Sequence, residues 1–470
     1  MQRKTLPYLT VLSLFIGICA PTLFSDGMFL DGITYSAISK NMAHGYGRFW
    51  EPHYTEGLAP LFYGHPPLAI GLQAIFFKFF GDSIFVERLY SLLTFLITGG
   101  LIVLIWKRIS GSFKFGWLPL LLLILVSDVS WACSNNMLEN TMMIFTTLSF
   151  LWILKGEKKN LIWFALAGIS LFLALLCKGL TSLYIWSAPL LIWVFLKKQS
   201  FSKMLIQSTV LVVSTIIPVL ILILFSEDAQ NFLIKYIYEQ VFDGIANVQT
   251  VNSRFTIVWK FIEKIIPSLL LILGILIFAK RKKLHLKIGD KKKLGFVLIA
   301  LTFTGILPIM ISLKQRGFYI LTVYPFFAIG AGIMLLPIVS QIKSLKLKWV
   351  KLLFVFSTTV AISVSIISWG EIGRDKNLIH DCKLIINTIG HRKLVNVCSD
   401  TRKRYNVIGY FSRYGGISLM HSKQSSEEYV ILFKNNCLNE FEGQFKKVNI
   451  PTKDFHLYKK EKEKVFSYLE

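Results

Sequence analysis

The chain has 470 residues, of which 54% are hydrophobic and only 17% are charged, and its mean hydropathy is +0.56. A composition this apolar excludes a soluble globular protein of this length and predicts a polytopic membrane protein. The net charge of +25 does not indicate nucleic-acid binding, because the basic residues form short clusters between apolar stretches.

Several apolar stretches have the length of a membrane-spanning helix, which needs about 20 mostly apolar residues. Eleven such segments follow one another along the chain: 7–25, 85–106, 117–133, 138–154, 160–177, 181–196, 204–225, 260–279, 294–313, 317–337 and 350–369. The segment 117–133 has the shortest apolar run, because it contains Asp128 and Trp131. We therefore expect a polytopic α-helical membrane protein with about eleven transmembrane helices.

Basic clusters fall in alternate loops between these segments. They are Arg3-Lys4, Lys107-Arg108 with Lys114, Lys155 with Lys158-Lys159, Lys197-Lys198, the lysines of 280–283 and 291–293, and those of 343–348. Because positively charged loops stay in the cytoplasm, we expect a cytoplasmic N-terminus and an extracytoplasmic C-terminus in the cell inner (cytoplasmic) membrane. No small-x-small site follows the first segment, so we expect it to remain as a span.

Two of the outer loops are long, 26–84 and 226–259. The remaining long outer segment is the C-terminal tail, from about residue 370. The tail changes sharply to mixed charge and shorter apolar runs. We therefore predict a transmembrane domain over 1–369, with the outer loop 26–84, and a small extracytoplasmic α/β domain over 370–470.

The tail contains β-rich runs at 394–397 and 429–433 and a helical pattern at 383–389. It also carries cysteines on the side of the membrane where disulfides form. Cys398 and Cys437 are candidates for a pair, but a third cysteine in the tail leaves the pairing open.

An acidic residue, Asp31, follows the first span. Tyr35, Ile38 and Met42 come four, seven and eleven positions later, so all four side chains share one stripe of a helix. We expect this helix to lie along the membrane surface. Asp31 is either its N-cap or a carboxylate that takes part in chemistry at the bilayer surface, and the two roles are compatible.

Positive charges also occur in short outer turns, where the positive-inside bias disfavours them. Lys178 precedes Gly179 in one turn, and Lys314 and Arg316 lie in another. One explanation is snorkelling from a helix end. Three cations at one membrane boundary favour a second explanation, a binding site for a lipid phosphate.

Glu139 begins the segment 138–154 at the same boundary. A carboxylate in the first turn of a helix is often there because the macrodipole favours it. Together with Asp31, however, Glu139 supplies a second outer carboxylate beside the candidate phosphate site.

A series of short motifs carries a family resemblance. In chain order they are Asp31-Gly32-Ile33-Thr34-Tyr35, Tyr63-Gly64-His65-Pro66-Pro67-Leu68, Met137-Leu138-Glu139-Asn140, Leu175-Leu176-Cys177-Lys178-Gly179, Arg316-Gly317-Phe318-Tyr319 and Tyr324-Pro325. Over about 1–340 the chain resembles the bacterial branch of the dolichyl-phosphate-mannose protein mannosyltransferase and aminoarabinose transferase superfamily, which are membrane glycosyltransferases of the GT-C type. The tail is similar only in being an outer domain.

The resemblance implies a GT-C-like fold and a transferase that moves a sugar from a polyprenyl-phosphate donor to a lipid, protein or glycan acceptor at the outer face. It implies that Asp31 is the catalytic carboxylate and Glu139 the second acidic residue. It further implies that Lys178 holds the carrier phosphate with help from Arg316 and Tyr319.

The chain departs from the family pattern at two positions. Gly64-His65 stands where several relatives have Glu-Lys, and Thr34 stands where they often have Arg. The first departure removes a metal ligand proposed for some members, so we assign no cofactor and leave a divalent cation open. Tyr35, Tyr63 and His65 are further candidate substrate-binding residues, although a histidine before two prolines is more often structural.

The residue types suit this chemistry independently of the family. A polyprenyl phosphate is a good leaving group, and cations such as Lys178 and Arg316 stabilise the charge that develops on it. The acceptor needs a base within about 3 Å, for which Asp31 is the candidate, and we expect inversion at the anomeric carbon.

Two other functions remain open. A transporter or flippase of a lipid-linked envelope precursor would also need cations for a phosphate, but it predicts paired broken helices or two similar halves, which the sequence does not contain. A non-catalytic assembly partner is the third hypothesis. The sequence does not indicate the sugar, the carrier lipid or the acceptor.

Overall fold

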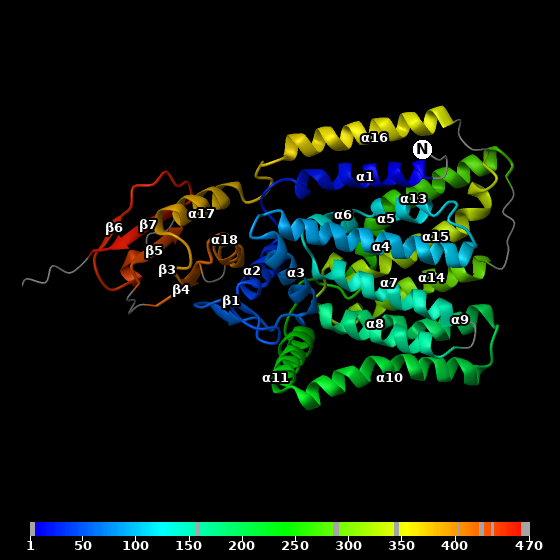
Figure 1. Ribbon diagram of the computed structural model, residues 1–470, viewed down its shortest axis with the longest axis horizontal. Coiled ribbons are helices and arrows are strands. Elements are labelled where there is room, and N and C mark those ends of the chain that lie inside the picture. The colour runs from blue at the N-terminus through cyan, green and yellow to red at the C-terminus, as the bar shows by residue number, and fades with distance from the viewer. Residues whose placement is uncertain are drawn as a thin grey trace, which may run out of the picture.

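The computed structural model describes residues 5–156, 160–284, 291–342, 347–399, 401, 404–422, 427–433 and 437–461. A bundle of long helices makes up most of it, and a smaller α/β part sits at one end of the bundle (Figure 1). The outer loop with α2, β1 and α3 lies between the two parts.

Each of the eleven predicted segments is helical. The helices that correspond to them are α1 (Leu6–Leu23), α4 (Val86–Ser110), α5 (Trp117–Ile124) with α6 (Ser127–Ser134), α7 (Leu138–Gly156), α8 (Ile162–Lys178), η1 (Leu180–Ser187) with α9 (Ala188–Leu196), α10 (Phe201–Phe225), α13 (Thr256–Arg281), α14 (Lys291–Ile306) with η3 (Leu307–Ile311), η4 (Gly317–Val323) with α15 (Tyr324–Val339), and α16 (Leu347–Ser368). Among the described residues, seven helices are long and apolar enough to cross a membrane, and one bent pair makes up to eight.

The bent pair is α5 and α6, whose axes differ by 79°. The bend comes where the sequence turns polar, at Ser127 and Asp128, because charged and polar side chains are costly inside a bilayer. The Asp128 carboxylate lies 3.6 Å from the ammonium group of Lys264 on α13. The polar composition of 117–133 thus corresponds to a broken helix.

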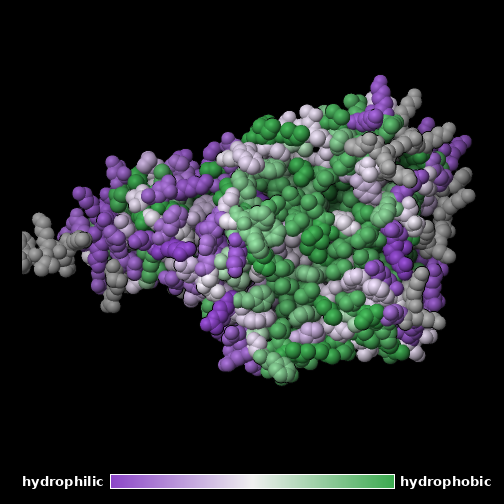
Figure 2. Space-filling model, viewed as in Figure 1, coloured by the Kyte–Doolittle hydropathy of each residue, from purple (hydrophilic) through white to green (hydrophobic). Residues whose placement is uncertain are grey.

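The surface of the bundle is apolar. Figure 2 shows hydrophobic residues over the long helices and hydrophilic residues over the α/β part and at the opposite end of the bundle. Large side chains such as Phe225 (83% exposed) and Ile367 (74% exposed) face outward from α10 and α16. Exposed apolar surface on helices long enough to cross a bilayer is lipid-facing surface, so the chain is a multi-span membrane protein.

The first outer loop contains α2 (Leu30–Ala43), β1 (His53–Thr55), β2 (Ala59–Leu61) and α3 (Leu68–Phe80). The helix predicted from the stripe of Asp31 is therefore confirmed. The interpretation of Asp31 as its N-cap is wrong, because the helix begins at Leu30 and Phe29 is the N-cap residue. Asp31 instead lies in the first turn, where a carboxylate is favoured by the helix dipole.

The second outer region is also helical. It contains α11 (Glu227–Lys235), the π-helix η2 (Tyr236–Phe242) and α12 (Asp243–Ala246). In Figure 1, α11 lies at the same end of the bundle as α2 and α3.

The C-terminal part is a five-stranded sheet with two helices, in which strands β3 and β5 confirm the two β-rich runs. Its elements are α17 (Lys376–Ile389), β3 (Leu394–Val397), α18 (Tyr405–Gly415), β4 (Ser418–Met420), β5 (Tyr429–Phe433), η6 (Leu438–Glu440), β6 (Phe445–Lys447) and β7 (Phe455–Lys460). The strand order is β4-β3-β5-β7-β6. β3 pairs in parallel with β4 and β5, while β7 is antiparallel to its neighbours. A disulfide joins Cys398 to Cys437.

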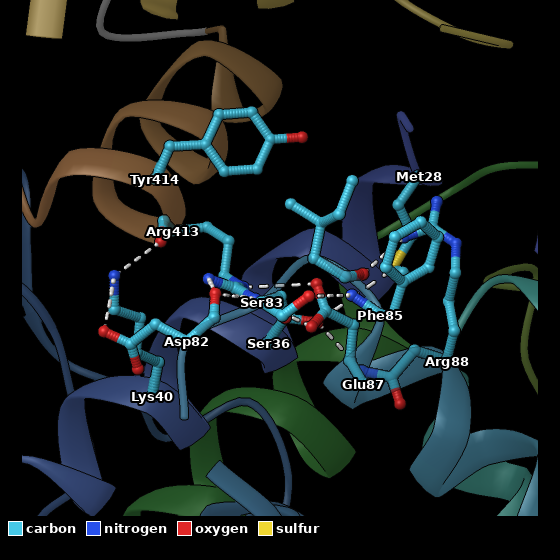
Figure 3. Close-up of polar contacts among 12 residues, drawn as sticks. Met28, Ser36, Lys40, Asp82, Ser83, Phe85, Glu87, Arg88, Arg413 and Tyr414 are labelled. Atoms are coloured by element: carbon cyan, nitrogen blue, oxygen red, sulfur yellow. Dashed lines mark hydrogen bonds and ion pairs between the residues drawn. The ribbon is translucent and has the colours of Figure 1, made fainter. Parts of the chain in front are cut away.

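Helix α18 docks this part onto the bundle (Figure 3). The Arg413 guanidinium donates two hydrogen bonds to the Glu87 carboxylate, of 2.8 and 3.1 Å, and both side chains are 1% exposed. The hydroxyl of Tyr410 accepts a hydrogen bond of 2.9 Å from the backbone N–H of Met28 and donates one of 2.9 Å to Asp375. Because Met28 lies two residues before α2, the C-terminal part holds the start of the helix that carries Asp31.

Candidate functional site

Asp31 presents a carboxylate without a partner. No hydrogen bond or ion pair joins its side chain to another residue in the described part of the chain. Partial burial raises the pKa of the Asp31 carboxyl, and the positive charges of Lys178 and Arg316 oppose this rise. The three side chains are therefore within electrostatic range of one another, although they come from α2, α8 and the start of η4.

Lys178 is the last residue of α8, and Gly179 after it has a φ of +111° that ends the helix. The ammonium group forms an ion pair with Glu139. It also lies 5.3 Å from the ring centroids of both Phe318 and Tyr319. This lysine is 6% exposed, so its charge is held in place by a carboxylate and two aromatic rings and does not snorkel to solvent.

Glu139 lies in the first turn of α7 and is 0% exposed. One of its oxygens pairs with Lys178, and the other, Oε2, has no hydrogen-bond partner among the described residues. Burial raises the pKa of Tyr35 well above its ordinary value, and the charges of Asp31 and Glu139 add to this effect. Tyr35 is therefore a neutral phenol close to both carboxylates.

Arg316 is exposed and precedes η4. Lys314, two residues earlier, donates a hydrogen bond of 3.4 Å to Gln240 of η2. Burial lowers the pKa of Lys314, and Lys178 lowers it further while Asp243 opposes the change. The structure thus brings together all three cations that the sequence placed in outer turns.

His65 is enclosed by aromatic rings, 6.0 Å from the Tyr35 centroid and 6.3 Å from that of Phe62. Burial lowers the pKa of His65 well below its ordinary value, and the nearby charges of Lys178 and Lys314 lower it further. The imidazole is therefore neutral near pH 7, and its Nδ1 has no partner among the described residues. His65 lies close to Lys178, as a substrate-binding residue would.

Tyr63 lies elsewhere. Its ring packs 5.4 Å from that of Phe232 on α11, and the ammonium group of Lys235 lies 4.5 Å from the Tyr63 centroid. These contacts place Tyr63 against the second outer region, and none of them reaches Asp31 or Lys178.

Sequence reasoning missed an aromatic cluster beside the cations. Phe29 packs against Trp131 at 5.0 Å and against Phe318 at 5.9 Å, and Trp131 stacks on Phe318 at 5.7 Å. Phe318 also faces Lys178. The available signal was the position of these residues next to the motifs, since Phe29 precedes Asp31 by two residues and Phe318 follows Arg316 by two.

The donor set does not fit a metal site. In the described part of the chain, no three His, Cys, Asp or Glu side chains are grouped so that they could hold a metal ion. Glu139 is already paired with Lys178, and the two carboxylates are surrounded by cations. We therefore derive no step through a metal ion.

Comparisons with known proteins agree with this architecture. The family model of dolichyl-phosphate-mannose-protein mannosyltransferases matches residues 64–222. The solved structure of ArnT from Cupriavidus metallidurans bound to undecaprenyl phosphate is similar with a TM-score of 0.70 at 13% identity, covering 97% of this chain and 98% of that one. This likeness shows that the chain has the fold of that membrane protein. The GT-C-like fold that the motifs implied is thereby confirmed.

Two further solved structures share the fold. ArnT from the same organism in the apo state matches with a TM-score of 0.64 at 14% identity, covering 95% of this chain and 96% of that one. The oligosaccharyltransferase of Archaeoglobus fulgidus matches with a TM-score of 0.51 at 10% identity, covering 92% of this chain and 70% of that one. No curated protein matches the sequence.

Proposed function

We propose that this protein transfers a sugar from a polyprenyl-phosphate donor to an acceptor at the outer face of the cytoplasmic membrane, with inversion at the anomeric carbon. The observation that carries the proposal is the unpaired Asp31 carboxylate beside Lys178 and Arg316. The ArnT structure that shares this fold holds undecaprenyl phosphate, which supports a lipid-phosphate donor here.

In the proposed reaction, the acceptor oxygen or nitrogen attacks the anomeric carbon as the bond from that carbon to the phosphate oxygen breaks. Asp31 takes the acceptor proton. The bond electrons leave with the carrier phosphate, and Lys178 and Arg316 stabilise the charge that develops there. The basic loops support a location at the outer face, because they lie at the opposite ends of the spans from Asp31.

The remaining site residues have supporting roles in this proposal. Glu139 positions the Lys178 ammonium group through their buried ion pair. Tyr35 and Tyr319 supply hydroxyl groups near both carboxylates, and His65 is a neutral side chain close to Lys178. Tyr63 packs against α11, and these contacts do not reach the reacting groups.

The first prediction concerns the Asp31→Asn variant. Removing the base should lower transfer by about 10²–10⁴-fold, because asparagine keeps the shape of the side chain but does not accept the proton. The measurement incubates purified protein with a panel of polyprenyl-phosphate sugars and an acceptor extract, and follows release of the bare carrier phosphate.

The same variant separates an enzyme from a flippase. If the protein were a flippase, the Asp31→Asn variant reconstituted in vesicles would move a labelled polyprenyl-phosphate sugar as well as the wild type does, and neither protein would release carrier phosphate. That pair of results would contradict the proposal, as would efficient use of a nucleotide sugar.

A further inference from the structure

A cavity lies between the outer loop and the C-terminal part, away from Asp31. Its volume is about 370 Å³, which falls in the range of small-molecule sites. One wall comes from the outer loop, with Lys40, Asn41 and Glu56, and from Asp82 before α4. The other wall comes from the C-terminal part, with Arg392, Lys393 and Ser412.

The cavity is separate from the reaction centre. Its nearest residue on α2 is Lys40, nine positions after Asp31. A helix rises about 1.5 Å per residue and turns about 100°, so Lys40 lies roughly 13 Å along α2 and on the opposite side from Asp31. A ligand in the cavity would therefore touch the far face of the catalytic helix.

The lining is polar and favours an anion. The basic side chains are Lys40, Arg392 and Lys393, and the acidic ones are Glu56 and Asp82. Asp82 is already engaged, because it lies 3.5 Å from the Lys40 ammonium group and 2.9 Å from His44 Nε2. Asp82 is thus paired with Lys40 and His44, whereas neither Arg392 nor Lys393 forms an ion pair with a residue in the described part of the chain.

Arg392 and Lys393 supply that free charge. Arg392 reaches across the cavity, where its Nη1 donates a hydrogen bond of 2.7 Å to the Tyr46 hydroxyl. A guanidinium has five N–H donors, so this bond leaves others for a ligand. Its backbone has a φ of +57°, which is uncommon for a residue with a side chain. The exposed Lys393 ammonium group makes no ion pair in the described part of the chain, with Glu428 as a nearby negative charge.

Neutral hydrogen-bonding groups complete the lining. Ser412 Oγ donates to the backbone oxygen of Tyr54 at 3.0 Å, and Ser418 Oγ accepts from the backbone N–H of Glu56 at 3.0 Å. Asn41 donates through its amide nitrogen to the same strand, which leaves its carbonyl oxygen as an acceptor. Hydroxyl and amide groups beside cations are the combination that binds a sugar carrying an acid group.

We propose that this cavity is a binding site for an acidic saccharide, that is, a sugar bearing a phosphate or a carboxylate, which bridges the outer loop and the C-terminal part. Arg392 and Lys393 bind the acid group, and the serine and asparagine side chains bind the sugar hydroxyls. The site is independent of the transfer reaction proposed above, because binding there requires neither donor nor Asp31.

The test is calorimetric titration of the purified full-length protein in nanodiscs with glucose 6-phosphate, glucuronate, glucose and inorganic phosphate. We expect the two acidic sugars to bind at least about ten-fold more tightly than glucose, as charge-assisted hydrogen bonds require, and more tightly than inorganic phosphate. Equal binding of glucose would overturn the proposal. Phosphate that binds as tightly as glucose 6-phosphate would overturn the saccharide assignment. Weaker binding of glucose 6-phosphate in nanodiscs that contain phosphatidic acid would show that the lipid competes for the cavity, and it would overturn the assignment in favour of lipid headgroups.

Variants locate the site. Lys393→Gln and Arg392→Gln should each weaken glucose 6-phosphate binding by about ten-fold, whereas Lys447→Gln, the same charge change on exposed β6, should not. Lys393 carries the test if the Arg392 variant does not fold, because its side chain supports no contact with the outer loop. Unchanged binding in Lys393→Gln would overturn the proposal. Asp31→Asn should bind as wild type does, so failure of sugar transfer and failure of this site are distinguished.

Discussion

The environment of Asp31 has two opposing effects on the pKa of its carboxyl group. Burial favours its neutral form, while Lys178 and Arg316 favour its charged form. Because the net effect raises the pKa, Asp31 is a better proton acceptor than an ordinary surface carboxylate. Two cations near a base also keep it ionised when a phosphate approaches.

This environment predicts a pH dependence. A general base works only when it is deprotonated, so transfer should fall as the pH decreases through the pKa of Asp31. Since that pKa is raised, the fall should begin above the range of an ordinary carboxyl, whose pKa is about 3.9. The measurement is kcat/KM for the donor against pH. A profile that stays flat down to the ordinary carboxyl range would contradict Asp31 as the base.

Lys178 and Glu139 form a second test at the scale of single residues. Both are buried, so removing one partner leaves an uncompensated charge, at a cost of about 3–5 kcal/mol. We expect the Lys178→Met variant to unfold at a lower temperature and to lose its ability to transfer sugar from the donor. The double variant Lys178→Met/Glu139→Leu should recover much of the stability but not the activity.

Thermal unfolding and donor KM measured on the same preparations separate the two roles. If the double variant regains sugar transfer together with stability, the lysine has only a structural role and does not bind the donor phosphate.

At the scale of elements, helices α2 and α18 pack directly against each other. Helix α18 contacts the residues before α2 through Tyr410. It contacts α4 through the pair of Arg413 and Glu87, which Figure 3 shows. The C-terminal part is thus fastened to the helix that carries the proposed base, and its position bears on the geometry of the reaction centre.

The Arg413–Glu87 pair gives a prediction for this docking. Arg413→Met leaves the Glu87 carboxylate buried without its partner, which should weaken docking by about 3–5 kcal/mol. We expect faster protease cleavage in the segment between α16 and α17 and a lower rate of transfer. The control is Arg413→Met/Glu87→Leu, in which no charge is left buried. Cleavage as slow in Arg413→Met as in wild type would show that the pair does not hold the C-terminal part.

Across the whole molecule, the apolar belt separates two polar ends (Figure 2). The end with α2, α11 and the C-terminal part carries the site, and we propose that it faces away from the cytoplasm. The basic loops at the other end support this orientation.

Orientation is tested by single cysteines on a background without the native ones. Lys447→Cys on β6 and Lys198→Cys in a basic loop are both exposed positions. A membrane-impermeant maleimide added to intact cells should label the first, and it should label the second only after lysis. The reverse pattern would place the reaction on the cytoplasmic side.

The sequence by itself determined the positions of the helices of the bundle, the outer helix of Asp31 and two adjacent inner strands of the C-terminal sheet, β3 and β5. Those features depend on local hydropathy and on periodicity, which are written in consecutive residues. The motifs also indicated the superfamily. The interpretation of Asp31 as the N-cap placed the start of α2 two residues too late, because helix ends depend on contacts such as the hydrogen bond from Phe29 N–H to Asn135.

Only the tertiary structure decided which polar groups meet. Arg413 and Glu87 are 326 positions apart, and no local pattern relates them. The pairing of Lys178 with Glu139, the placement of Tyr63 against α11 and the cavity beside Arg392 likewise arise where separate elements pack together. Burial and electrostatic partners are properties of that packing. The charge state of these residues, and which of their donors and acceptors have no partner, are therefore set only once the chain is folded.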